Sequence, residues 1–142
     1  MWKTLVPFTL AVGFVAGAAA SDAEGAKYRC TADKTTVSHY LTVQVRDGKI
    51  GSFSYMAATP ADGMVNSCTV DSSGAKQADI GPGMQSFQTD AGQVVVARKG
   101  PRFDFDFTKI SIGDVCGQSS TIAAHIELTL GSKGCTEVTN RD

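Results

Sequence analysis

Hydrophobic and polar residues alternate along much of the chain, with a period of two. Between Tyr40 and Arg46, Leu41, Val43 and Val45 fall on one face and polar side chains on the other. Such a period is typical of a β-strand with one buried face. The alternation is strictest in the segment 102–107, in which three phenylalanines alternate with two aspartates. No stretch after residue 20 keeps a helical period for three turns, so the pattern predicts a β-protein.

Turn-forming residues divide this pattern into short strands. Asp47-Gly48 predicts a tight hairpin, because both residues tolerate a positive φ. The segment 49–56 is then the returning strand, and Pro60 with Asp62-Gly63 predicts a loop over 57–63. Further strands are expected at 65–70, 84–88, 93–98, 102–112 and 121–130, with irregular structure at 78–83.

The number and spacing of these segments define the expected fold class. Seven to nine antiparallel strands with glycine-rich turns are typical of an all-β domain. We expect a single small antiparallel β-barrel, since closure removes exposed strand edges. A β-sandwich is the alternative.

The first twenty residues predict export. One positive charge at Lys3 precedes an uncharged run that ends in Ala18-Ala19-Ala20, as in a secretory signal peptide. Residues 1–20 are therefore the expected signal peptide and residues 21–142 the single mature domain. We expect a periplasmic or secreted protein that does not insert into the membrane after cleavage.

The cysteines agree with an oxidising compartment. The chain has four cysteines, all after residue 20. An even number of cysteines in a small exported domain indicates disulfides, here two, for which three pairings are possible. Closure of a barrel would bring the terminal strands together, which favours Cys30–Cys135 with Cys68–Cys116. A zinc site is the competing interpretation, but the chain has no Cys-x-x-Cys pair and only two isolated histidines.

The charge balance excludes one class of partner. Loss of residues 1–20 removes only Lys3 and leaves a net charge of −2, compared with −1 for the full chain. This balance is not that of a nucleic-acid-binding protein. It is compatible with a cationic partner.

The sequence contains little that suggests catalysis. His39 and His125 lie in no motif that supplies a nucleophile, and we expect neither an enzyme nor a bound metal or cofactor. Asp104 and Asp106 are the one close carboxylate pair, projecting from one strand face about 7 Å apart. Such a pair could bind Ca²⁺ or serve in acid–base catalysis, as the carboxylates of glycosidases do. The simpler interpretation, which we favour, is that the phenylalanines beside them fill the core while the aspartates face water.

Binding is the remaining class of function. Ser52, Ser54 and Tyr55 combine hydroxyl groups with an aromatic ring in one short segment. The segment 98–102 is a basic turn in a slightly acidic domain. A lysine on a rigid hairpin can reach carboxylates in a partner's cleft.

These features resemble the bacterial periplasmic and membrane-bound inhibitors of c-type lysozyme. The aromatic-x-Cys opening is Tyr28-Arg29-Cys30, and Ser52-Phe53-Ser54-Tyr55 keeps the serine and tyrosine of the first family motif, with Phe53 in place of glycine. Lys99-Gly100 keeps the end of the second motif, and Thr108-Lys109 keeps its Thr-Lys pair. The resemblance implies a small β-barrel in which Ser52, Ser54 and Tyr55 line the inhibitory surface. It also implies that Lys99 or Lys109 approaches the catalytic acids of the lysozyme.

Two further hypotheses remain at this stage. A small-ligand carrier would hold its ligand in a barrel interior lined by the apolar residues Phe53, Val94, Val96, Phe103 and Phe105. A cavity of about 300 Å³ or more would support it. The other hypothesis is a structural or interaction protein of the cell envelope.

Overall fold

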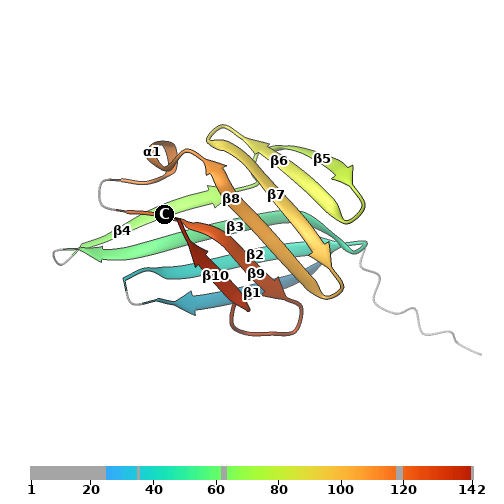
Figure 1. Ribbon diagram of the computed structural model, residues 1–142, viewed down its shortest axis with the longest axis horizontal. Coiled ribbons are helices and arrows are strands. Elements are labelled where there is room, and N and C mark those ends of the chain that lie inside the picture. The colour runs from blue at the N-terminus through green and yellow to red at the C-terminus, as the bar shows by residue number, and fades with distance from the viewer. Residues whose placement is uncertain (1–24, 35, 62–63, 118–119, 142) are drawn as a thin grey trace, which may run out of the picture.

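The computed structural model describes residues 25–34, 36–61, 64–117 and 120–141 (Figure 1). The expected signal peptide, residues 1–20, lies outside the described residues. The chain forms strands β1 (Ala26–Asp33), β2 (Ser38–Arg46), β3 (Lys49–Ala61), β4 (Met64–Asp71), β5 (Lys76–Gly81), β6 (Met84–Thr89), β7 (Gly92–Lys99), β8 (Arg102–Ile110), β9 (Ala123–Thr129) and β10 (Glu137–Asn140), with one short helix, α1 (Ile112–Val115).

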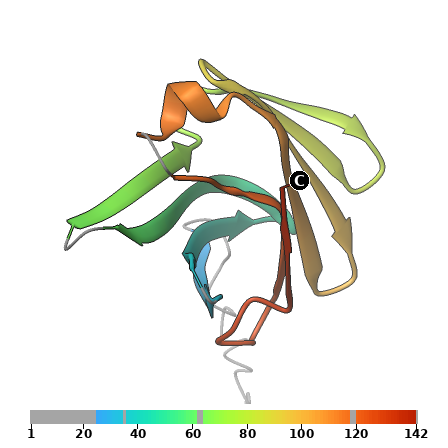
Figure 2. The ribbon, with the colours of Figure 1, turned by 60° about the vertical axis from the view of Figure 1, so that its left-hand side comes forward.

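The strands form two antiparallel sheets that face each other (Figure 2). The first sheet has the order β1-β2-β3-β4 and the second the order β10-β9-β8-β7-β6-β5. The all-β prediction is therefore confirmed. No closed barrel forms among the described residues, because β1 and β4 border the first sheet and β10 and β5 the second.

The core lies between the two sheets. Phe53 of β3 packs edge-on against Phe87 and Phe105 of the second sheet, with ring centroids 5.2 and 5.5 Å apart. The residues expected to line a barrel interior are all buried, namely Phe53, Val94, Val96, Phe103 and Phe105. The rings of Phe53 and Phe105 contact each other between the sheets, so the protein's own side chains occupy this part of the interior.

The Asp47-Gly48 hairpin is present as predicted. Asp47 has a φ of 52° and Gly48 a φ of 73°, the conformation that this dipeptide allows without the usual steric penalty. β3 is longer than expected and continues through Pro60, where a loop was predicted. β3 pairs with β2 only as far as Ala58, and beyond it one edge of β3 has no partner strand. Pro60, which has no backbone N–H, is tolerated there because no hydrogen bond to β2 is lost.

Three other predictions need correction. The segment expected to be irregular at 78–83 contains most of β5, and the strand expected at 121–130 is shorter, Ala123–Thr129. The strand expected at 102–112 ends at Ile110, and neither β1 nor β10 was predicted. Both β5 and β10 lie at sheet edges with mostly exposed side chains, so they lack the alternation that marks a buried strand.

Two disulfides fasten the sheets together at opposite sides. Cys30 of β1 bonds to Cys135, just before β10, and Cys68 of β4 bonds to Cys116, just after α1. This is the pairing expected from the sequence. Each bond joins an edge strand of the first sheet to a segment connected to the second, so the disulfides hold the two layers in register. Two disulfides are consistent with an oxidising location outside the cytoplasm.

Candidate protein-binding site

The residues predicted to bind a partner are distributed over three places. Ser52 and Ser54 lie on the outward face of β3, where Ser54 is exposed and Ser52 donates a hydrogen bond to Gln44 Oε1 (3.2 Å). Lys99 and Lys109 lie in the other sheet. The sequence segments that share motif fragments therefore do not form one surface.

Tyr55 lies in the core, which corrects the prediction that it contacts a partner. Its side chain has no exposed surface, and its ring stacks on Phe107 with the centroids 4.6 Å apart. The hydroxyl accepts a hydrogen bond from the Ala123 N–H and is 2.9 Å from His39 Nδ1. Burial raises the pKa of this hydroxyl far above its ordinary value. Since successive strand residues point to opposite faces, an outward Ser54 requires an inward Tyr55.

Lys99 and Lys109 lie at opposite ends of the β7–β8 hairpin. Lys99 is opposite Arg102 beside the turn, whereas Lys109 is opposite Gln93 at the far end. Both side chains are exposed. Only one of the two lysines can therefore enter a given cleft of a partner.

Three turns meet at the end of the molecule that carries Lys99. Arg98 connects them: its backbone N–H donates to Gly83 O (2.7 Å), and its guanidinium donates to Gly100 O (2.9 Å) and to Gly48 O. The guanidinium also lies over the Phe103 ring, 5.2 Å from the centroid. Arg98 thus fixes the β7–β8 turn against the β2–β3 and β5–β6 turns.

We call this region the basic end and define it by Lys49, Arg98, Lys99 and Arg102. Two of these cations have an acidic neighbour, Lys49 with Asp79 at 2.6 Å and Arg102 with Glu127 at 3.9 Å. Within the described part of the chain, the Lys99 ammonium forms neither an ion pair nor a hydrogen bond. Lys99 is therefore a cation on a fixed turn that is available to a partner.

The two histidines lie in different surroundings. His39 is buried beside Tyr55, and burial, followed by the charge of Lys34, lowers its pKa. His125 lies on the outward face of the second sheet, with Nδ1 3.1 Å from Asp104 and Nε2 3.9 Å from Asp106. The two aspartates share this outward face while the neighbouring phenylalanines are buried, as the simpler interpretation predicted.

The cluster around His125 lacks the geometry of a nucleophile and base. The Thr108 hydroxyl donates to Asp106 (2.6 Å) and not to the imidazole. Partial burial alone would raise the pKa of the Asp106 carboxyl, but the two Thr108 hydrogen bonds and the His125 and Lys109 charges lower it overall. Among the described residues, no group of three or more His, Cys, Asp or Glu side chains could hold a metal ion.

Comparisons of the chain with protein-family models, with curated proteins and with solved structures found no match. In the described part of the chain, no helix has the length and apolar character needed to cross a bilayer.

Proposed function

We propose that this chain is an exported binding protein that recognises another protein through its basic end. In this proposal the two sheets are an incompletely closed barrel, and the disulfides fasten its two seams. The observation that carries the proposal is the combination at the β7–β8 turn: Lys99 is exposed and unpaired, and Arg98 holds the turn in place. No step of chemistry is required of the protein.

A charge on a turn that is already fixed can be presented to a partner at a small entropic cost. Lys99 follows a residue that is already fixed by contacts with three turns, so the backbone loses little conformational freedom when it docks. An ammonium group on such a turn can form charge-assisted hydrogen bonds with carboxylates of a partner. The strongest match is a partner with acidic side chains in a cleft that the narrow hairpin can enter.

We propose c-type lysozyme as the first such partner to test. The resemblance in the motif fragments supports it, since the inhibitors of that family present a lysine to the catalytic acids of the enzyme. The structure changes the expected site residues. Lys99 is the lysine that we assign. Ser52 and Ser54 lie on the outer face of the other sheet and are not part of the assigned site, and Tyr55 contributes only to the core.

Titration of the oxidised protein into a lysozyme lysis assay on bacterial cell walls tests the proposal. Saturable inhibition of a c-type enzyme is expected, with g- and i-type enzymes unaffected. Lys99→Ala should weaken inhibition by about tenfold or more, since a desolvated charge pair is lost. Lys109→Ala is the matched control, because it removes an equally exposed lysine from the other end of the same hairpin. Equal effects of the two substitutions, or no inhibition by the parent, would contradict the proposal.

The alternatives receive less support from the geometry. A ligand carrier needs an interior cavity, whereas Phe53, Phe87, Phe105 and Phe107 contact one another in the space between the sheets. The hydroxyl–imidazole pair used in nucleophilic catalysis is not formed at His125, because the Thr108 hydroxyl donates to Asp106. An envelope interaction protein would use the same basic end with another partner, which a pull-down from envelope extracts with the Lys99→Ala control would identify.

A further inference from the structure

The outer face of the first sheet carries a second polar surface, independent of the basic end. A shallow depression of about 320 Å³ there is lined by Arg29, Tyr40, Thr42, Ser54, Met56 and Thr69. We call this surface the hydroxyl face. These residues come from all four strands, and the register places Arg29, Thr42 and Ser54 in one row across β1, β2 and β3.

The depression continues along the sheet. A second hollow of about 320 Å³ also includes Thr42 and Ser54 and extends to Lys27 and Ser52. The shared residues make the two hollows neighbours along β2 and β3, from Tyr40 and Met56 to Gln44 and Ser52. Two open, neighbouring hollows on one sheet face fit an extended chain better than a compact small molecule, which binds in an enclosed pocket.

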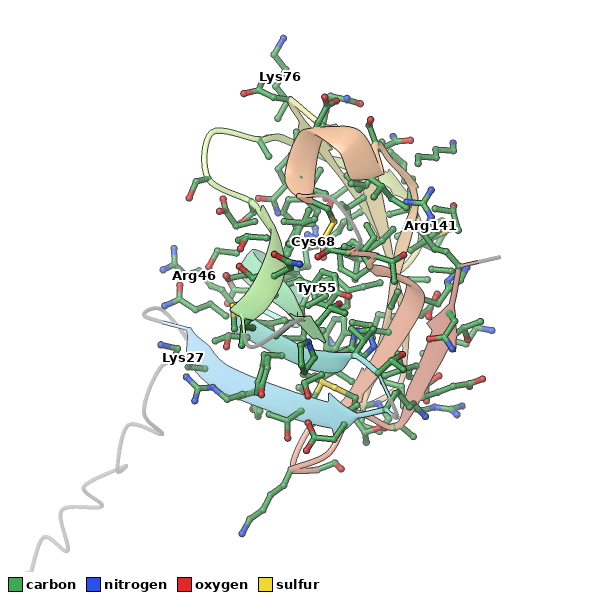
Figure 3. All side chains as sticks on the ribbon, turned by 90° about the vertical axis from the view of Figure 1, so that its left-hand side faces the viewer. Lys27, Arg46, Tyr55, Cys68, Lys76 and Arg141 are labelled. Carbon is green, nitrogen blue, oxygen red and sulfur yellow. A yellow bond between two sulfur atoms is a disulfide. The ribbon has the colours of Figure 1, made fainter. Side chains whose placement is uncertain are left out.

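The charges on this face favour an anionic ligand. Lys27 and Arg29 project outward two residues apart on β1, which places them about 7 Å from each other. Arg46 projects from the same side of the molecule as Lys27, as Figure 3 shows. Within the described residues, none of these three cations has an ion pair. One carboxylate, that of Asp71, also lines the second hollow, opposite Ser54, and it accepts a hydrogen bond from the Ser73 N–H.

The composition between the charges favours a polysaccharide over a protein. The centres of protein interfaces are rich in apolar and aromatic side chains and poor in serine and lysine. Here hydroxyl groups predominate, and the apolar surface is limited to Tyr40 and Met56, which are 37% and 38% exposed. Hydroxyl groups can donate to and accept from sugar hydroxyls, and an exposed ring can cover the apolar face of a pyranose.

We propose that the hydroxyl face binds an extended anionic polysaccharide that carries carboxylate groups along its chain. Arg29 and Lys27 pair with the carboxylates, Tyr40 packs against a sugar ring, and Thr42 and Ser54 hydrogen-bond to hydroxyl groups between them. This site is separate from Lys99, which lies in the other sheet, so it stands or fails independently of the proposed protein target.

Calorimetric titration of the oxidised protein with polygalacturonate tests the proposal. Saturable binding is expected, and Arg29→Ala or Tyr40→Ala should weaken it by about tenfold each. Tyr40→Phe keeps the ring and should retain most of the affinity. Lys76→Ala is the matched control, because Lys76 is an exposed cation on β5, at the edge of the other sheet.

Two further polymers decide between ligand classes. Dextran is uncharged, and its binding should be much weaker than that of polygalacturonate. Polyglutamate supplies carboxylates without sugar rings, and equal binding of this polymer would show an acidic protein to be the ligand class instead. The proposal would be overturned by that result, by the absence of polygalacturonate binding, or by variants at Arg29 and Tyr40 that bind as the parent does.

Discussion

The hydroxyl of Tyr55 offers the sharpest test of the internal structure. It accepts a hydrogen bond from the Ala123 N–H and is bonded to His39 Nδ1, at 2.9 Å in each case. Tyr55→Phe keeps the ring that stacks on Phe107 and removes only the oxygen atom. Both partners are buried, so each is left without a bond in the core. An unsatisfied buried polar group costs about 1–3 kcal/mol.

We therefore expect Tyr55→Phe to lower the free energy of unfolding by about 2–4 kcal/mol. In urea this corresponds to a decrease of about 1–2 M in the midpoint, measured by far-UV circular dichroism of the oxidised protein. Tyr40→Phe is the control, since the Tyr40 ring is 37% exposed and its hydroxyl is not confined in the core. The control should stay within about 0.5 kcal/mol of the parent.

The same substitution separates a core role for Tyr55 from a surface role. Because Tyr55 has no exposed surface, the folded variant should inhibit lysozyme as strongly as the parent does. An unchanged midpoint together with weakened inhibition would refute our assignment. It would show that the Tyr55 hydroxyl reaches a partner and that its bonds to Ala123 and His39 contribute nothing.

Stability should also depend on the His39 proton, on the backbone at Gly92 and on the Cys30–Cys135 bond. Burial lowers the pKa of His39 from 6.5, so just below pH 6.5 the unfolded state binds a proton that the native state does not. Stability should therefore fall as pH drops through 6.5. A parallel pH dependence of the urea midpoint in the His39→Gln variant would contradict this. Gly92 has a φ of 135°, and a Cβ there would collide with the Lys109 carbonyl. Gly92→Ala should therefore lower the free energy of unfolding by about 2 kcal/mol or more. Gly100→Ala, which has open space around it, should lower it less in the same titration. Replacement of both Cys30 and Cys135 by serine should lower the free energy of unfolding by about 3–5 kcal/mol, because the bond closes a loop of 105 residues and so restricts the unfolded chain. A much smaller change in the urea midpoint would contradict this explanation of the stabilisation.

The parts of the fold that could be predicted are those in which burial leaves a pattern in the sequence. β8 has one face in the core, so Phe103, Phe105 and Phe107 alternate with polar residues. The β2–β3 turn could be predicted because Asp47-Gly48 tolerates the positive φ angles that it needs. β5 has six exposed residues at a sheet edge, so no hydrophobic period reveals it. The same alternation, continued from Phe53, would have placed Tyr55 in the core.

The candidate site could be predicted only in part. The basic turn at 98–102 was evident from its charges, but the role of Arg98 depends on a contact with Gly48, which is 50 residues away in sequence. Local patterns carry no information about such a contact. The division of Ser54 and Tyr55 between surface and core likewise separates a motif fragment that looks continuous in the sequence.

The nested arrangement of the disulfides has a consequence for how the protein matures. Cys30 pairs with the last cysteine of the chain, and Cys68 with the third. The chain emerges N-terminus first, so Cys30 and Cys68 become available to an oxidant before either of their native partners does. Cells that oxidise thiols in order of appearance would join these two and trap a bond absent from the native protein. Correct maturation therefore requires that Cys68 stay reduced until residue 116 has emerged, or that an isomerase reshuffle the first bond.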